Sequence, residues 1–287
     1  MNFYAVEGFA LDAAGDHLAE VTYDVADHSQ VPGLLVKTLR RLLDEVEYPV
    51  YSAVVVVMGI VHRGRVVHSE SFPLLNDNSW LDQLNEILME NGHEAEIVAL
   101  NDAKVAARWM YSRFVNTEGA PEAMIALHCS EDLGCALIFD GVLLEGAHGA
   151  AGEILQQVDS EWNVASQLLR DLEHDHGVPI RKLFGEAEVR DRGKPFVGKL
   201  GALIGKALVP MVLMVDPDMV AIGGAITDCG KSLIDAIEIE LNKATLTPPL
   251  VQMVPQGAQS VKDGAKMFVL TQARRVTMEA LKRAGAG

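Results

Sequence analysis

Residues 138–154 read IFDGVLLEGAHGAAGEI and hold the densest group of local structural signals in the chain. An apolar run ends at Asp140-Gly141, the kind of dipeptide that is the strongest short signal for a β-hairpin. A glycine- and alanine-rich segment follows and ends at the carboxylate of Glu153. Glycines allow a tight turn and a close backbone approach. A carboxylate at the end of such a turn therefore indicates a binding role for Glu153.

Two apolar runs precede this turn, AMIAL at 123–127 and CALIF at 135–139. They predict two neighbouring strands. The segment between them contains Ser130, Glu131, Asp132 and Gly134. A loop that binds phosphate at this place needs glycines and hydroxyls, because backbone N–H groups must approach the anion closely. The two acidic residues oppose that use.

The residues before this region predict a first α/β domain. We expect strands at 3–11, 17–25, 51–60 and 95–100, a hairpin turning at Arg63-Gly64, and helices at 32–47, 79–92 and 101–114. The leucines of the first helix, from Leu34 to Leu43, recur at helical spacing. Ser79 and Asn101 are the expected N-caps of the second and third helices, and Gly92 is expected just past the end of the second.

The pattern restarts after residues 119–121. It predicts polar helices over 162–192, a long helix over 194–215, a strand over 219–226, a helix over 231–243, a strand over 250–255 and a final helix from Gly264. Each half contains strands followed by helix, strand and helix, which indicates an α/β fold. We expect an N-terminal domain over 1–115, a C-terminal domain over 116–265, and a C-terminal helix over 266–287 that returns to the first domain.

The composition narrows the class of protein. The 287 residues carry a net charge of −16, which argues against a global basic surface for nucleic acid or anionic membrane. The three cysteines show no paired spacing, so a structural zinc held by several thiolates is not expected. The N-terminus lacks the pattern of a signal peptide, and acidic residues interrupt the longest apolar stretch. These features predict a cytoplasmic protein that does not span a membrane.

Four stretches resemble the ROK family of repressors, open reading frames and sugar kinases. They are ALNDAKVAA at 99–107, residues 138–154, LVPMVLMVDPDMVAIGGAI at 208–226, and SVKDGAKMFVLTQA at 260–273. The resemblance spans most of the chain. It implies an α/β fold of two ribonuclease-H-like domains, of the actin-like sugar-kinase type, around a central cleft.

The resemblance also implies a sugar site. Asp102 matches the family's catalytic base, and Asn101 and Glu153 match ligands of sugar hydroxyls. Gln156 stands where the family has a histidine that contacts sugar and, in many members, zinc. The alternative for Asp102 is a carboxylate that only complements the helix dipole, and the alternative for Asn101 is an ordinary cap.

The family's phosphate motifs are replaced. The region that should carry Asp-x-Gly-Gly-Thr reads VEGFALDAAGD, at 6–16, and Ser130, Glu131, Asp132 and Gly134 replace Gly-Thr-Gly-x-Gly. Gly223 and Gly224 match the segment that contacts adenosine. One unpaired like-charge contact with phosphate at ~4 Å costs roughly 4 kcal/mol at an effective dielectric constant of ~20. ATP and Mg²⁺ binding in the family's manner is therefore disfavoured.

Other family features are also missing. The cysteine-rich zinc segment is absent, so we expect no zinc, and His174 and His176 lack partner ligands at suitable spacing. Ser71 or Phe72 stands where the family has a sugar-binding asparagine. Loss of the phosphate motifs resembles the repressor branch, although the sequence shows no helix-turn-helix, so direct DNA binding is not expected.

Three functions remain open. The first is a sugar-binding regulatory protein derived from a kinase, of the carbohydrate-responsive transcriptional-regulator type. The second is an ATP-dependent sugar kinase that uses Mg²⁺ and Asp102 as base. The third is an interaction protein without a ligand. Asn101, Asp102 and Glu153 favour the first two, and the replaced phosphate motifs favour the first. By resemblance we also expect a homo-oligomer.

Overall fold

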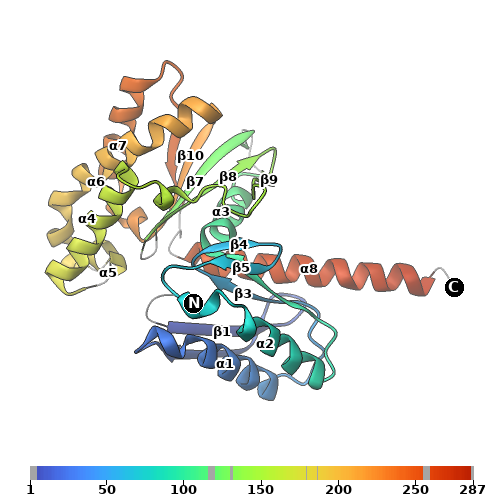
Figure 1. The fold of residues 1–287 in the computed structure, drawn as a ribbon. Coiled ribbons are helices and arrows are strands. Elements are labelled where there is room, and N and C mark those ends of the chain that lie inside the picture. Colours follow the sequence, from blue (N-terminus) through green and yellow to red (C-terminus); the bar gives the residue numbers. More distant parts are fainter. Residues whose placement is uncertain are drawn as a thin grey trace. The chain divides into compact units, whose positions relative to one another are not determined.

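The computed structural model describes residues 5–115, 120–129, 132–178, 180–185, 187–254 and 259–285, without the side chains of 181, 185, 187–194 and 283–285. The chain divides into two compact units (Figure 1). Unit 1 comprises residues 1–105, 147–150 and 262–287, and unit 2 comprises residues 106–146 and 151–261. Both units combine helices and strands, which confirms the predicted α/β class.

Unit 1 is built on short paired strands. β1 (Ala5–Leu11) pairs antiparallel with β2 (His17–Asp24), β3 (Ala53–Val57) pairs in parallel with β6 (Ile97–Asn101), and β4 (Ile60–His62) pairs antiparallel with β5 (Arg65–His68). The helices are α1 (Val31–Glu45), α2 (Ser79–Glu90), the first turn of α3 (Asp102–Ser112), and nearly all of α8 (Ser260–Gly285), together with the short 3-10 helices η1 (His28–Gln30) and η2 (Pro73–Leu75). The strands together with α1, η2 and α2 form one core that includes Val6, Leu35, Phe72, Trp80 and Leu84.

The turns of unit 1 follow from their residues. Arg63 and Gly64 have φ angles of 51° and 78°, the left-handed pair that a two-residue hairpin requires, and the predicted hairpin is confirmed. Between β1 and β2, the Oδ1 atom of Asp12 accepts hydrogen bonds from the N–H groups of Ala14, Gly15 and Asp16, each at 2.9 Å. One carboxylate therefore organises this turn.

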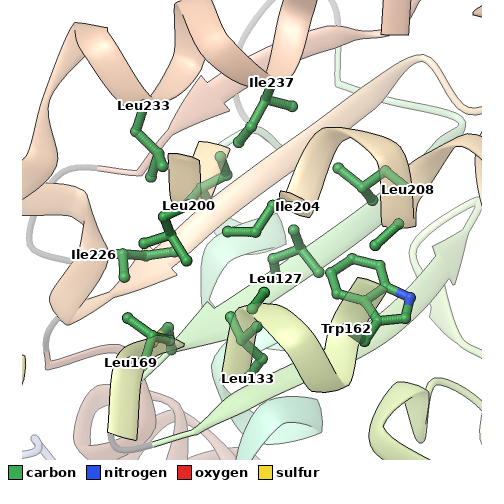
Figure 2. Close-up of a cluster of buried hydrophobic side chains, with 14 of the residues drawn as sticks. Leu127, Leu133, Trp162, Leu169, Leu200, Ile204, Leu208, Ile226, Leu233 and Ile237 are labelled. Carbon is green, nitrogen blue, oxygen red and sulfur yellow. The ribbon is translucent and has the colours of Figure 1, made fainter. Parts of the chain in front are cut away.

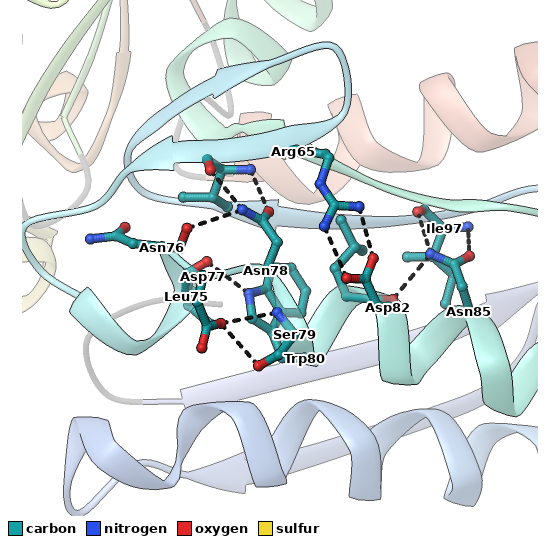
Figure 3. A network of polar contacts seen from close by, with 12 residues as sticks. Arg65, Leu75, Asn76, Asp77, Asn78, Ser79, Trp80, Asp82, Asn85 and Ile97 are labelled. Carbon is teal, nitrogen blue, oxygen red and sulfur yellow. Dashed lines mark hydrogen bonds and ion pairs between the residues drawn. The ribbon is translucent and has the colours of Figure 1, made fainter.

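Side-chain amides connect α2 to the strands of unit 1 (Figure 3). Asn78 accepts from the N–H of Val66 at 2.8 Å and donates to its carbonyl at 2.9 Å. Asn85 makes the same paired contact with Ile97, at 2.7 and 3.1 Å. The predicted cap at Ser79 is wrong, because Asn78 is the N-cap and Ser79 is already helical. Ser79 instead donates from its N–H and hydroxyl to Asp77.

Unit 2 contains a five-stranded mixed sheet in the order β11-β10-β7-β8-β9. The strands are β7 (Ala123–Cys129), β8 (Leu133–Phe139), β9 (Val142–Leu143), β10 (Met219–Gly224) and β11 (Leu250–Met253). The helices are α4 (Glu161–His176), α5 (Ile180–Gly185), α6 (Ala187–Val215) and α7 (Lys231–Ala244), with the short 3-10 helices η3 (Ile154–Gln156) and η4 (Ala225–Cys229). Asp140 and Gly141, with φ angles of 48° and 76°, form the predicted turn between β8 and β9.

The core of unit 2 lies between its sheet and helices α4 to α7. Figure 2 shows Leu127 and Leu133 from the strands packing with Trp162, Ile204 and Ile237 from the helices. Met110 of α3 lies against Gly223 of β10 and is fully buried. The residues of α3 that belong to unit 2 therefore pack on the same sheet.

Two glycines allow α6 and α7 to pack with their backbones close together. A Cβ atom at Gly201 would lie 2.6 Å from the Cβ of Ala236, and one at Gly205 would lie 2.9 Å from the carbonyl oxygen of Ile237. Both distances are too short for any side chain. Small residues four positions apart on one helix therefore set the spacing of this helix pair.

α6 also contains the most apolar stretch in the described chain. Residues 195–215 are long and apolar enough to cross a membrane, judged by length and composition alone, and 44% of the most apolar window is buried. Its buried side chains include Leu200, Ile204 and Leu208, which belong to the core of unit 2. Core packing therefore accounts for the apolar face of this helix.

Candidate functional site

Asn101 is the last residue of β6, and its side chain holds the start of α3. Its Oδ1 atom accepts from the N–H of Lys104 at 2.8 Å, and its Nδ2 atom donates to the carbonyl oxygen of Gly59 at 2.9 Å. The side chain is 7% exposed. The predicted N-cap is therefore confirmed. One amide hydrogen and one lone pair remain for a ligand.

Asp102 is the first residue of α3 and is half-buried. The cap at Asn101 fixes the direction in which the helix starts, and so it also fixes the backbone of Asp102. A carboxylate here lies at the positive end of the helix dipole, which favours its ionised form. A general base must be ionised to accept a proton, so this placement is compatible with that role.

Lys104, two residues further on, was not singled out from the sequence. It is 6% exposed, and its Nζ atom donates to the carbonyl oxygen of Gly149. A buried ammonium group needs hydrogen-bond acceptors, because burial otherwise makes its charge costly. Lys104 therefore ties the first turn of α3 to the segment 147–150, within unit 1.

Gly149 fills a place that no other residue can occupy. Its φ angle is +76°, and a Cβ atom would lie 2.2 Å from the carbonyl oxygen of Val61. The segment 147–150 thus lies directly on β4. The predicted glycine-rich turn has a packing reason at this position, in addition to any role in ligand binding.

Glu153 and Gln156 lie in unit 2, at the two ends of η3. Glu153 is the half-buried residue that precedes η3, and Gln156 is exposed. Gly152 has a φ angle of +85°, and a Cβ there would lie 2.3 Å from the carbonyl oxygen of Cys135. Burial, with a smaller contribution from the charge of Glu153, raises the pKa of the Cys135 thiol to about 12. Cys135 is therefore an inert thiol.

The four predicted sugar ligands are thus divided between the units. Asn101 and Asp102 belong to unit 1, and Glu153 and Gln156 belong to unit 2. The contacts at Asn101 fix the first pair within unit 1. The backbone turn at Gly152 fixes the start of the second pair within unit 2.

The segment between β7 and β8 contains the predicted phosphate-loop residues. Ser130 and Glu131 lie outside the described residues. Asp132 accepts a hydrogen bond from the hydroxyl of Ser166 and pairs with Arg170 at 3.2 Å, both on α4. Its charge is therefore partly offset, and it repels an approaching anion less than the unpaired carboxylate considered above.

Close packing requires two of the three predicted nucleotide-site glycines, Gly223 and Gly224. Gly134 is paired with His128 across β8 and β7. A Cβ at Gly223 would lie 2.6 Å from the sulfur of Met110, and one at Gly224, where φ is +84°, would lie 2.0 Å from the carbonyl oxygen of Cys129. These packing requirements explain the glycines at 223 and 224 without a nucleotide.

A buried histidine, His128, lies near the end of β7. His128 is 2% exposed, its Nδ1 atom lies 3.1 Å from the hydroxyl of Ser260, and its Nε2 atom has no hydrogen-bond partner. Burial lowers the pKa of His128 to about 4, so the ring is neutral at pH 7. No sequence pattern indicates this pair, because its members lie 132 residues apart.

Two further observations concern ligands. A shallow groove of about 620 Å³ on unit 2 is lined mainly by α4 and includes Asn163, Gln167, Arg170 and Lys199. It contains none of the predicted site residues. Within the described ranges, no three or more His, Cys, Asp or Glu side chains are grouped so that they could hold a metal ion. His176 instead packs edge-on against Phe196.

No protein-family profile and no curated protein sequence matches this chain. Solved structures do match. A ROK family protein from Streptococcus pneumoniae, in complex with sucrose, has a TM-score of 0.70 at 16% identity, over 96% of this chain and 97% of that one. ROK hexokinase from Thermus thermophilus has a TM-score of 0.64 at 18% identity, over 96% and 97%.

A ROK family transcriptional regulator, a homologue of the E. coli MLC protein, also matches, with a TM-score of 0.61 at 14% identity over 94% of this chain and 78% of that one. Kinases and a regulator thus share the fold, which does not distinguish the repressor branch from the kinases. The chain has the two-domain fold of the ROK family of sugar kinases and transcriptional regulators, as the resemblance of its motifs implied.

Proposed function

We propose that this protein binds a sugar or sugar derivative and acts as a regulatory protein with little or no phosphate transfer. The carrying observation is the arrangement at the start of α3. Asn101 caps the helix and is bonded to Gly59, and Lys104 holds the segment 147–150. This arrangement presents Asp102 on a fixed backbone, as a binding carboxylate requires.

Binding of a carbohydrate is supported by the chemistry of the candidate ligands. Carboxylates and amides are good partners for sugar hydroxyls, since hydroxyls both donate and accept hydrogen bonds. Asp102, Glu153 and Asn101 supply these groups. The neighbour from S. pneumoniae was solved with sucrose, which is consistent with a sugar ligand for this fold.

The contacts of Asp12 support the proposal of little or no phosphate transfer. In the β1–β2 turn, the N–H groups of residues 14–16 all donate to Asp12, and so they are not free to hold a phosphate. A loop that grips phosphate needs such groups free.

The second candidate is an ATP-dependent sugar kinase with Asp102 as base. Two observations favour it. Sugar kinases outnumber regulators among the similar solved structures, and they include a ROK family glucokinase from Streptomyces griseus in complex with glucose and AMPPNP. The pairing of Asp132 with Arg170 also weakens the electrostatic objection to a bound nucleotide.

Calorimetric titration separates these functions. The ligands are hexoses, N-acetylhexosamines and their phosphates, and Mg·ATP is titrated separately. We expect a sugar to bind and Asp102→Asn or Glu153→Gln to raise its Kd about tenfold or more, because a hydrogen bond to a charged group contributes about 1.5–3 kcal/mol. Asp175→Asn, at an exposed position of α4, is the control and should leave the Kd unchanged.

Two outcomes would contradict the proposal. Magnesium-dependent consumption of ATP that needs both the sugar and Asp102 would establish the kinase instead. Failure of the whole panel to bind would favour an interaction protein without a ligand.

A further inference from the structure

His62, the last residue of β4, is a half-buried histidine whose ring makes no hydrogen bond within the described part of the chain. Of its two ring nitrogens, Nδ1 is buried without a partner. A polar atom buried in this way destabilises a protein, because water no longer satisfies it. The folded chain therefore holds this ring in place without using either of its nitrogens.

Other half-buried histidines of unit 1 use their rings differently. The Nδ1 atom of His28 lies 3.1 Å from the carbonyl oxygen of Ser71, and the Nδ1 atom of His93 accepts from the N–H of Val50 at 3.3 Å. Each of these contacts connects segments 43 residues apart. A structural hydrogen bond thus accounts for both residues, and no such bond accounts for His62.

The hairpin that carries His62 is fixed to β6 on both sides of this residue. The carbonyl oxygen of Gly59 accepts from the Nδ2 atom of Asn101 at 2.9 Å. The carbonyl oxygen of Gly64 accepts from the N–H of Ala99 at 2.8 Å. The backbone of His62 is therefore held beside the end of β6, where α3 begins.

The segment 147–150 also packs against His62. A Cβ atom at Gly149 would lie 3.0 Å from the Cβ atom of His62, next to the carbonyl oxygen of Val61. The carbonyl oxygen of Gly149 accepts the hydrogen bond from Lys104, in the first turn of α3. His62 and the first turn of α3 thus contact the same glycine, within unit 1.

The burial of Nδ1 decides which tautomer the neutral ring of His62 adopts. A neutral imidazole carries one N–H group, on either nitrogen. A proton on Nδ1 would be a buried donor without an acceptor, whereas Nε2 is not among the buried atoms that lack a partner. The proton therefore stays on Nε2. The ring thus presents one N–H donor on its accessible edge.

We infer that His62 is a further sugar-binding residue, whose Nε2–H group donates to a hydroxyl oxygen of the sugar that Asp102 binds. This inference rests on the proposed function. A sugar hydroxyl can accept as well as donate a hydrogen bond, whereas an ionised carboxylate only accepts. A histidine donor near Asp102 therefore complements that carboxylate, and it makes the site selective for a sugar with an acceptor at this position.

Three substitutions at His62 test this contact by calorimetry with the tightest-binding sugar of the hexose and N-acetylhexosamine panel. His62→Leu removes both nitrogens and should raise the Kd about fivefold or more. His62→Gln places an amide N–H near the position of Nε2 and should stay within about threefold of the wild type. His62→Asn places its amide near the position of Nδ1 instead and should bind as weakly as the leucine variant.

The matched control is His68→Leu, at an exposed position of the same hairpin, which should leave the Kd unchanged. Circular dichroism checks that each variant is folded. Nitrogen NMR of the histidine side chains provides a second measurement. The Nε2 signal of His62 should report a protonated nitrogen in the free protein, and it should shift when the sugar is added.

Monodeoxy analogues of the sugar identify the hydroxyl group. For one analogue, the wild type and His62→Leu should bind equally, because the contact is already lost in both complexes. An unchanged Kd in His62→Leu, or rescue by asparagine but not by glutamine, would overturn the inference while sugar binding by the wild type still supports the proposed function. Failure of the wild type to bind any sugar of the panel would overturn both.

Discussion

The Nζ atom of Lys104 donates a hydrogen bond to the carbonyl oxygen of Gly149, a residue 45 positions further along the chain. The contact joins the helix that begins with Asp102 to the segment that leads toward Glu153. Both partners belong to unit 1, although Glu153 belongs to unit 2. One buried lysine thus joins the helix that begins with Asp102 to the segment 147–150 within unit 1.

Replacing Lys104 by methionine keeps most of the volume and removes the donor. The buried carbonyl of Gly149 then loses this bond, so we expect the free energy of unfolding to fall by about 1–3 kcal/mol. We also expect weaker sugar binding. Urea denaturation and calorimetry measure the two effects, and Lys199→Met, at an exposed position of α6, is the control. Unchanged stability would show that the contact contributes nothing.

Gly149→Ala should destabilise the protein strongly, although it adds only one methyl group. The new Cβ would lie 2.2 Å from the carbonyl oxygen of Val61, at a φ angle of +76°. We expect the free energy of unfolding to fall by about 2 kcal/mol or more. Gly198→Ala is the matched control, since nothing lies within 4 Å of a Cβ there. In the interior of α6, this change should raise the free energy of unfolding by as much as about 1 kcal/mol, since alanine favours a helix more than glycine does. Equal effects in a denaturation series would contradict the assigned packing.

Asn101→Ala tests the cap of α3. It removes the acceptor for the N–H of Lys104 and the donor to Gly59, and we expect a loss of about 1–2 kcal/mol. Asn101→Asp keeps the acceptor, loses the donor and adds a negative charge that the helix N-terminus favours, so its free energy of unfolding should fall less. Denaturation at pH 7 compares the three proteins. If the aspartate variant is the less stable of the two, the bond to Gly59 is the more important contact.

Because His128 is buried and neutral, we expect the protein to lose stability as the pH falls. Its pKa in the folded protein is about 4, lowered by burial from 6.5. The unfolded chain therefore binds a proton at His128 below about pH 6.5. The folded protein binds this proton only below about pH 4. The neutral ring's contribution is complete above pH 6.5 and is lost as the pH falls toward 4. By pH 4.5 the cost is about 2–3 kcal/mol.

The control for this prediction is the double variant His128→Leu with Ser260→Ala, which removes both members of the buried pair. Denaturation at pH 7 and pH 4.5 gives the difference for each protein. The double variant should lose about 2–3 kcal/mol less than the wild type over this interval. Equal losses would assign the acid sensitivity to other groups.

Local signals in the sequence predicted local structure well. The Arg63-Gly64 and Asp140-Gly141 hairpins form because both dipeptides adopt left-handed backbone angles. The cap at Asn101 forms because its acceptor lies three residues from the N–H that it binds. The prediction failed at Ser79, because Asn78 occupies the cap position while its side chain pairs with Val66 of β5 and makes no hydrogen bond to the helix. The last helix begins at Ser260, before the predicted Gly264.

Long-range contacts in the candidate site had no such signal. Asp132 was expected to face an anion as an unpaired charge, and it is paired with Arg170, 38 residues away. Lys104 and His128 are buried polar residues whose partners lie 45 and 132 residues away. Periodicity and turn chemistry report on neighbours within a few residues, so they carry no information on these pairs.

The glycines of α6 also have a mechanical consequence. With Gly201 and Gly205 in close contact with α7, a slide of one helix along the other would push a side chain of α6 into the carbonyl groups of Leu233 or Ile237. Helices that pack through larger side chains can shift by changing rotamers, and this pair cannot. α6 and α7 should therefore move together as one rigid pair. A conformational change within unit 2 should then occur in its turns.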